Sequence, residues 1–521
     1  MTGAGFMSIQ DTQVPTPPGR ASFEPRCTEL PSSPRTDLGT VLVTGASGYV
    51  GGRLVPELAM RGYRVRAMIR GTETGDLDSW PEVEIVMADA LDPPSLARAL
   101  EGVSVAYYLI HSMVLGPGEF ARADLQSARN FREAAQDAGV ERIIYLGGLG
   151  ACGANLSRHL DSRKQVAEEL ACGSVPCTIM RASIIIGSGS ASFEIIKGLV
   201  NRLPVIPFPT WADNLSQPIG IRDVVKYLVG VMELPLLGDR TFDIGGLEVM
   251  TYGDMIIELA SLLGKRTHFV RVPIQGTKLV AYAISLLTPV PAPISMCLTG
   301  GLKSDTVCDY NAIQILLPFH PISYREALVR ALDREEQDSV ATRWSDAYPP
   351  AHELSIKLPE LRRPPRYRAA YHLLTNNSAA DLFSAIARIG GREGWFDTNW
   401  MWRLRGDFDR MIFGVGTARG RRSARGLRLG DVIDFWRVED LKPDRRLLLR
   451  AEMRMPGRAW LEFDIGEEDG LRRLGITAHY ATKSPFGHLY WRFFQPFHWY
   501  IFEHMLKQIE IRSRVADNPT S

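Results

Sequence analysis

A glycine-rich stretch, TGASGYVGG, constrains this chain more than any other segment. It spans Thr44–Gly52, follows the apolar run Val41–Val43 and precedes apolar residues at helical spacing. This pattern predicts a strand, a tight turn and the N-terminus of a helix. Glycines in such a turn let backbone N–H groups approach a pyrophosphate, and the helix dipole favours the anion. A second apolar strand, Arg64–Ile69, completes the strand-helix-strand unit that a dinucleotide site requires.

Length and composition narrow the class of protein. A chain of 521 residues predicts two or three domains. The formal net charge of +1 gives no indication of a nucleic-acid partner. The six cysteines form no CxxC pair and have no metal-ligand spacing, so we expect no bound metal, no disulfide framework and the reduced thiols of a cytoplasmic protein.

The first 38 residues are rich in proline and lack an apolar core, which predicts a disordered tail and no signal peptide. The most apolar helical candidate, Leu279–Leu287, is much shorter than the ~20 residues that a membrane span needs, and prolines follow it. We therefore expect no transmembrane segment, while peripheral membrane contact stays open.

From Thr40 to about Leu203, strands and helices alternate, which predicts an α/β domain with a doubly wound parallel sheet, and we expect the whole domain to span residues 39–340. Ligands of such sheets bind beyond the carboxyl ends of the strands. The predicted strands end at or just before six residues that we expect to converge on one crevice, namely Gly45, Arg70, Asp89, His111, Gly147 and Ala182.

The composition changes after a proline- and arginine-rich stretch, residues 341–368, which we interpret as a linker. Aromatic residues between Trp395 and Phe463 occur in strand-like runs such as VIDFWRVE, RLLLRAEM and RAWLEFDI. They predict an antiparallel sheet, followed by an aromatic helix over Tyr490–Arg512 that breaks or starts near Pro496. The second domain would span residues 369–515, and a curved sheet with a long helix suggests a helix-grip fold.

Several segments together resemble a known family. TGASGYVGG, ADALDPPSL, YYLIHSM, IIYLGGLG and HLDSRKQVAEEL look like an atypical, extended-type short-chain dehydrogenase/reductase over residues 40–335. The stretch GREGWFDTNWMWRLRGDFDRMIFGVGTARGRRS resembles a domain of unknown function that is similar to the polyketide-cyclase/START-like superfamily. The first resemblance implies a Rossmann domain that binds NAD(P). The second implies an apolar ligand between sheet and helix, although aromatic side chains that fill this space are an equal alternative.

The residue at the end of the second predicted strand indicates which cofactor the site prefers. An acidic residue there would accept hydrogen bonds from an adenosine ribose, whereas Arg70 favours the 2′-phosphate of NADP, with NAD possible. By resemblance, Asp89 would meet the adenine and Ile110 would line the nicotinamide side. The predicted cofactor-binding residues are Gly45, Ala46, Ser47, Gly48, Tyr49, Val50, Gly51, Arg70, Asp89, Ala90, Ile110 and Lys164.

The catalytic residues depart from the family pattern. That pattern uses a Tyr acid, a Lys four residues later and a Ser after the fifth strand. Lys164 fits the Lys, but Leu160 stands where the Tyr belongs, and Gly147 or Gly148 replaces the Ser. Substitute acids are Tyr107, Tyr108, His111, Tyr145 and His159, and we select Tyr108 and His111 beside Lys164 as catalytic candidates.

Two hypotheses follow. The first is an NADP-dependent oxidoreductase or isomerase that acts on an apolar carbonyl compound, with the C-terminal domain binding or presenting it. The second is a dinucleotide-binding sensor that catalyses no reaction, which the missing Tyr and Ser favour. The oligomeric state is open in both.

Overall fold

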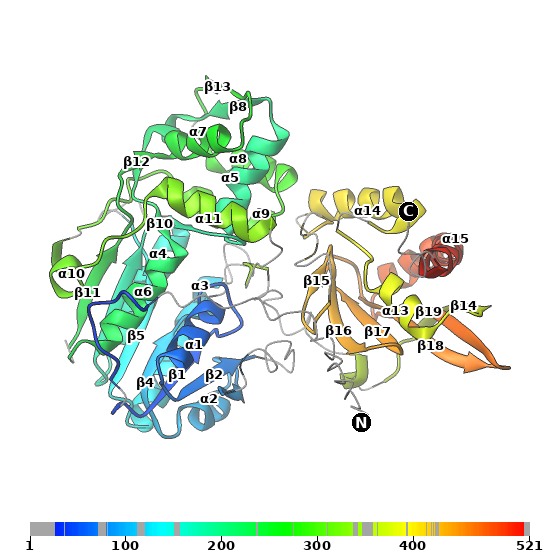
Figure 1. The fold of residues 1–521 in the computed structure, drawn as a ribbon, viewed down its shortest axis with the longest axis horizontal. Helices are drawn as coiled ribbons and strands as arrows, with labels where there is room; N and C mark the ends of the chain where they lie inside the picture. Colours follow the sequence, from blue (N-terminus) through cyan, green and yellow to red (C-terminus); the bar gives the residue numbers. More distant parts are fainter. Residues whose placement is uncertain are drawn as a thin grey trace, which may run out of the picture.

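A computed structural model shows two domains side by side (Figure 1). The structure describes residues 27–514 apart from 36, 71–79, 81, 112–119, 151–156, 236–237, 275, 310, 337–341, 346–357, 362, 392–393, 413, 418, 420 and 422–426. Residues 1–26 of the expected tail, much of the expected linker and the last residue of the expected second domain therefore lie outside the described residues.

Seven parallel strands form the sheet of the first domain, in the order β11-β6-β5-β4-β1-β2-β3. The strand order reverses beside β1, and a crevice for ligands opens at such a switch point. This confirms the predicted doubly wound sheet. The strands are β1 (Thr40–Thr44), β2 (Val65–Ile69), β3 (Glu84–Met87), β4 (Val103–Tyr108), β5 (Arg142–Gly148), β6 (Cys177–Ala182) and β11 (Arg240–Ile244).

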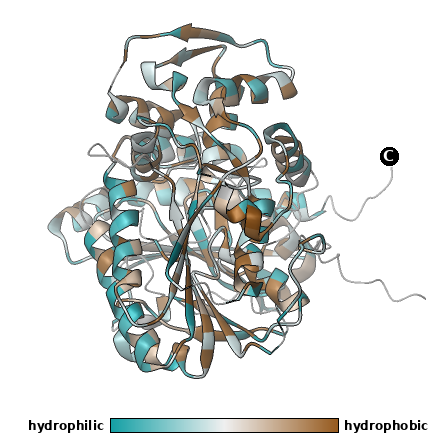
Figure 2. Ribbon diagram, turned by 90° about the vertical axis from the view of Figure 1, so that its left-hand side faces the viewer, coloured by the Kyte–Doolittle hydropathy of each residue, from teal (hydrophilic) through white to brown (hydrophobic). Residues whose placement is uncertain are grey.

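Helices cover both faces of this sheet. Because side chains alternate along a strand, Val41 and Val43 pack toward α1 and α6, and Leu42 packs toward α2 and α3. The strands carry mostly hydrophobic colouring, and the covering helices show hydrophilic outer turns (Figure 2). The covering helices are α1 (Gly51–Met60), α2 (Pro93–Leu100), α3 (Phe120–Asp137), α4 (Arg158–Ala171) and α6 (Ile221–Glu233).

A smaller region lies above the carboxyl ends of the strands (Figure 1). Its own core contains Phe193, Leu259 and Leu328. The region contains β7 (Ile185–Ile186), α5 (Ala191–Arg202), β8 (Val205–Phe208), η3 (Thr210–Asp213), β9 (Leu215–Ser216), β10 (Ile219–Gly220), β12 (Met250–Thr251), α7 (Tyr252–Leu262), β13 (His268–Arg271), α8 (Thr277–Leu287), α9 (Ala292–Gly301) and α11 (Tyr324–Glu336). Helix α10 (Asn311–Leu316) packs instead beside β11 of the sheet domain.

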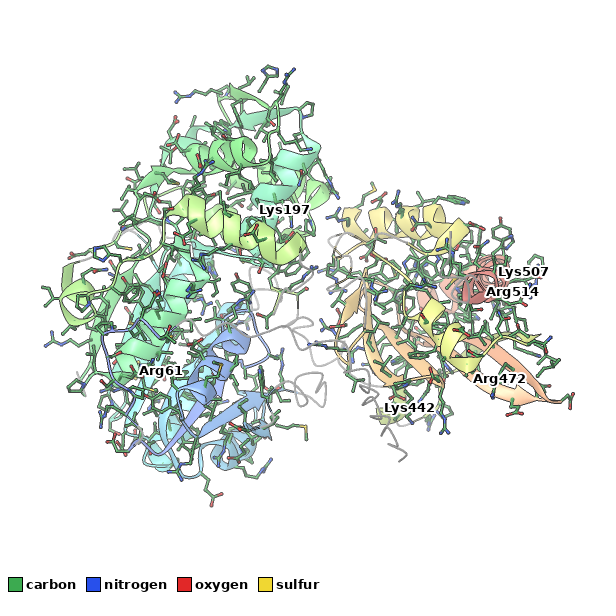
Figure 3. The ribbon with its side chains drawn as sticks, in the orientation of Figure 1. Arg61, Lys197, Lys442, Arg472, Lys507 and Arg514 are labelled. Carbon is green, nitrogen blue, oxygen red and sulfur yellow. The ribbon has the colours of Figure 1, made fainter. Side chains whose placement is uncertain are left out.

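The segment before β1 packs on the sheet domain. Cys27 is fully buried, and its backbone N–H donates to Glu57 at 2.7 Å. Arg61, at the end of α1 (Figure 3), donates to the Cys27 carbonyl at 2.6 Å and pairs with Glu233 of α6 at 2.7 Å. Part of the expected tail is therefore attached to the first domain.

The second domain contains a six-stranded antiparallel sheet in the order β14-β19-β18-β17-β16-β15. The long helix α15 packs against β14, β19 and α13. Large aromatic side chains, among them Trp395, Phe435 and Trp491, pack in the core between sheet and helices. The elements are η4 (Leu358–Glu360), β14 (Tyr367–Thr375), α13 (Ala379–Ile386), η5 (Phe396–Thr398), α14 (Asn399–Met411), β15 (Val432–Ile433), β16 (Trp436–Lys442), β17 (Arg446–Ala451), β18 (Arg458–Glu468), β19 (Leu471–Ala481) and α15 (Pro485–Arg514).

Two local predictions for the second domain differ from the structure. Trp400, Trp402 and Phe408 lie in helix α14, whereas their aromatic run suggested strands. Their spacing leaves Trp402 on the inner face and the other two outside, which is a helical arrangement. Helix α15 runs through Pro496 without a break. Because Pro496 is exposed, its missing N–H removes a hydrogen bond only on the solvent side.

Candidate functional site

The glycine loop after β1 has the geometry of a phosphate-binding turn. Gly45 has φ +63°, and a Cβ there would lie 2.9 Å from the Leu109 carbonyl oxygen. A Cβ on Gly48 would lie 3.1 Å from the Gly45 carbonyl oxygen, and one on Gly51 would overlap that oxygen. No side chain caps the N-terminus of α1, so its dipole faces the loop. These residues fit the pyrophosphate of a dinucleotide.

The loop is joined to the neighbouring strand by Thr44. Its hydroxyl donates to the Tyr107 carbonyl at 3.0 Å and accepts from the Leu109 N–H at 3.0 Å. The ends of β1 and β4 are therefore held together, and Ile110 and His111 follow directly beside the glycine loop.

A second contact to the loop comes from far along the chain. Thr342 donates from its hydroxyl to the Tyr49 carbonyl at 2.9 Å, and Trp344 donates from its N–H to the Gly189 carbonyl at 2.9 Å. The buried Arg53 donates to the same Tyr49 carbonyl at 2.9 Å and stacks on the Tyr49 ring at 4.2 Å. We call residues 342–345 the strap. Sequence reasoning placed it in the linker because nothing in its composition marks it as a contact.

The residues expected to bind adenosine lie at the ends of β2 and β3. Arg70 is exposed at the carboxyl end of β2. Arg66 lies earlier on the same strand and is held by Glu84 at 2.9 Å. Asp89 accepts a hydrogen bond from the Leu91 N–H at 2.9 Å, which orients its carboxylate at the turn. Ala90 is buried, and its carbonyl accepts from Asn130 at 2.9 Å.

The three catalytic candidates have different surroundings. Tyr108 is 1% exposed and packs 5.0 Å from Phe131 in the core. Lys164 points outward from α4, with its side chain 62% exposed and 3.7 Å from Glu168. His111 is accessible to solvent, yet burial, the charge of Arg163 and the nearby His159 ring hold its pKa well below the ordinary value. A position in a crevice explains both the exposure and the lowered pKa of His111, because protein atoms surround the ring while one edge stays open to solvent.

Arg163 is the centre of a polar cluster that the sequence did not single out. Its guanidinium donates to the Tyr145 hydroxyl at 3.4 Å, and that hydroxyl donates to the Arg163 carbonyl at 3.3 Å. Burial acts to lower the pKa of Arg163, but Tyr145 and the buried Asp124 outweigh it and raise the value. Burial and Arg163 lower the pKa of His159 to about 3.

The cluster therefore combines a fixed cation with two neutral imidazoles at pH 7. His159 and Arg163 are four residues apart, so they share one face of α4, whereas Lys164 lies on another. The His-x-x-x-Arg spacing was the signal available in the sequence. Helix α9 packs against this side of α4. Burial raises the pKa of the Cys297 thiol on α9 to about 11, although the charge of the nearby Arg163 acts to lower it.

Other classes of site find no support in the described part of the chain. Within it, no group of three or more His, Cys, Asp or Glu residues could hold a metal ion. The helices that the structure describes include none long and apolar enough to cross a bilayer.

Two families match separate parts of the chain. Residues 45–183 match the family described as NAD(P)H-binding. Residues 363–505 match a family described as protein of unknown function, DUF2867. The first domain is thus an NAD(P)-binding Rossmann domain of the short-chain dehydrogenase/reductase type. In this chain it is joined to a DUF2867 domain.

Curated relatives match the first domain. A ceramide reductase of Caulobacter vibrioides is 28% identical over 241 residues, which cover 46% of this chain and 75% of that protein. A 3-beta-hydroxysteroid dehydrogenase of Mycolicibacterium neoaurum is 33% identical over 120 residues, 21% of this chain and 32% of that protein. Among solved structures, a triphenylmethane reductase of Citrobacter sp. complexed with NADP(H) is 20% identical, with a TM-score of 0.46, and the match covers 56% of this chain and 99% of that one.

Proposed function

We propose that this protein is an NADP(H)-dependent oxidoreductase acting on an apolar carbonyl compound. The observation that carries the proposal is the polar cluster around Arg163. It lies beside the end of β4, at the same edge of the sheet where the glycine loop follows β1. A site that only senses a dinucleotide needs the loop but has no use for a cation and two neutral imidazoles next to it.

The residues divide the chemistry as follows. Gly45–Gly51 would hold the pyrophosphate, Asp89 and Ala90 the adenine side, and Ile110 the nicotinamide side. When bound, the nicotinamide supplies or accepts the hydride. His159 and His111 would donate hydrogen bonds to the carbonyl oxygen and relay one proton from solvent, so that hydride and proton together convert a ketone or aldehyde to an alcohol.

Arg163 would stabilise the negative charge that develops on that oxygen. A fixed cation on α4 is what the family's Lys normally provides, and Arg163 faces the cluster while Lys164 faces solvent. Asp124 and Tyr145 hold Arg163 in place. The oxygen that accepts the proton would lie near His159, one helical turn from Arg163.

The names of the relatives support an apolar substrate, since a ceramide and a 3-beta-hydroxysteroid are both lipids. We also propose that the C-terminal domain has a helix-grip, START-like fold and presents the substrate. The packing of α15 against β14 and β19 supports this interpretation.

A fluorescence titration with NADPH and NADH tests the cofactor. We expect NADPH to bind more tightly, and Arg70→Glu to weaken NADPH by about 10- to 100-fold, the effect of one charge-assisted contact. Arg64→Glu is the matched control, because Arg64 is exposed just before the opposite end of β2. Equal losses in both variants would contradict a role for Arg70, and no binding of either nucleotide would overturn the proposed function.

A further inference from the structure

Helix α14 exposes an apolar stripe. Trp400, Leu404, Phe408 and Met411 are each 61–63% exposed and follow one another at spacings of four, four and three residues. This spacing places them on one face of the helix. The opposite face, which includes Trp402, is buried in the second domain. The exposed apolar residues of α14 therefore repeat as regularly as apolar residues that pack into a core.

The first half of α15 has a second stripe of the same kind. Its members are 42–75% exposed and repeat at three or four residues, namely Phe486, Leu489, Phe493, Phe497 and Tyr500. In the second half of the helix, residues such as Met505 and Ile509 are buried, and charged residues such as Lys507 and Arg514 project outward (Figure 3). The exposed aromatic face is thus confined to one end of α15.

The two stripes belong to neighbouring helices. Arg405 of α14 stacks over Tyr490 at 5.3 Å and over Phe494 at 5.1 Å, both on α15. On its other side, α14 meets α8 of the first domain, where the Tyr282 hydroxyl donates to the Met411 carbonyl at 3.3 Å. Helix α8 itself exposes Leu279 by 70%. We call the exposed apolar residues of α8, α14 and α15 the aromatic surface.

The charges around this surface are positive where the aromatic content is highest. Residues 485–500 include no Asp or Glu, and half of them are Phe, Tyr or Trp. Arg492 lies within this segment, Lys483 precedes it and Arg403 lies on α14, and all three are exposed. Amphipathic aromatic rings with flanking cations prefer the headgroup region of a bilayer, and anionic lipids favour the cations.

We propose that the aromatic surface docks the protein on an anionic lipid membrane, with α14 and the first half of α15 lying in the interface. Over Phe486–Tyr500 the helix is about 21 Å long, which suits a helix lying flat on the membrane. Asp407 is exposed on α14, but the charged residues at the aromatic end of α15 are all cations, which suits anionic lipid headgroups. The inference stands on these residues alone and does not depend on the proposed function.

Vesicle flotation of the full chain tests the proposal. We expect binding to vesicles of phosphatidylcholine with 30% phosphatidylglycerol, and weaker binding to phosphatidylcholine alone. The combined variant Leu404→Ser, Phe408→Ser, Phe486→Ser, Phe493→Ser should reduce the bound fraction by about tenfold or more. Ile315→Ser is the matched control, because Ile315 is 79% exposed on α10, away from this surface.

Three results would overturn the proposal. The first is no binding of the wild-type chain to either vesicle, and the second is equal binding by the combined variant. The third is a wild-type dimer in light scattering that the combined variant converts to a monomer, since the surface would then be a protein contact. Unchanged circular dichroism and an unchanged thermal unfolding midpoint in every variant show that the fold remains intact.

Discussion

At the scale of single residues, the contrast between Arg163 and Lys164 decides how the candidate site is interpreted. The two cations are adjacent in sequence, but a rotation of about 100° around a helix separates neighbouring side chains. Arg163 consequently contacts Tyr145, and Lys164 extends to solvent. Matching a family motif by residue type selected the lysine, whereas the helix face selects the arginine.

We expect Arg163→Gln to raise the pKa of His159 above its value of about 3, because the variant removes a neighbouring positive charge. Lys164→Gln should leave that pKa unchanged. An NMR titration of the histidine ring protons measures both without a substrate. If the two variants shift the His159 resonance alike, Arg163 is not the cation that faces this ring.

Once a substrate is found, Arg163→Gln should lower kcat by about 10²- to 10³-fold, the usual effect of removing one group that stabilises an oxyanion. Lys164→Gln should stay within about twofold of the wild type, as for an exposed residue with one surface ion pair. The reverse ranking would restore the lysine to the role that the motif suggested.

At the scale of elements, α15 contributes side chains to the core of the second domain and also holds His498, whose pKa is shifted. His498 lies between Trp491 at 4.8 Å and Phe502 at 5.5 Å, and burial together with Arg405 lowers its pKa to about 4. The folded state therefore binds fewer protons than the unfolded state between about pH 6.5 and pH 4. Stability from this group is present at neutral pH and is lost as the pH falls.

We expect the stability advantage of the wild type over His498→Phe to shrink by about 1–2 kcal/mol between pH 7 and pH 4.5. Urea unfolding at both pH values measures it. The difference between the two proteins cancels the contribution of Asp434, because both contain it. Burial raises the pKa of Asp434 to about 6, so its own contribution to stability increases as the pH falls. A difference that does not change with pH would show that His498 charges freely in the folded state.

Sequence patterns predicted most elements of the first domain and fewer of the second. Alternating apolar strands and a glycine loop are local signals, so β1 to β6 and their helices could be located from the chain alone. Helix α14 was missed because its exposed aromatic stripe mimics strand composition. The strap and the Arg163 cluster could not be predicted, because each depends on contacts between distant segments.

At the scale of the whole molecule, one of the contacts between the two domains is made by Arg410 of α14. Arg410 donates to the Leu286 carbonyl at 3.0 Å and to the Thr288 carbonyl, at the end of α8. Burial lowers its pKa to about 10. A buried guanidinium that satisfies two helix-end carbonyls ties the domains together more firmly than an exposed contact would.

Arg410→Met should leave these carbonyls without their donor and cost about 2–3 kcal/mol, which weakens the coupling between the domains. Scanning calorimetry should then resolve two unfolding transitions where the wild type shows fewer or more closely overlapping ones. Arg403→Met, an exposed position on the same helix, should leave the profile unchanged. A single unaltered transition in Arg410→Met would mean that other contacts hold the domains together.

The strap has a consequence for how the two domains communicate. Thr342 contacts the glycine loop, and three residues later the Ser345 carbonyl accepts a hydrogen bond at 3.0 Å from Arg437, which is buried against Glu452 in the second domain. Ordering one end of so short a segment reduces the entropy that ordering the other end must lose. We therefore expect dinucleotide affinity and the docking of the second domain to share one coupling free energy, so that each changes by the same factor when the other is perturbed.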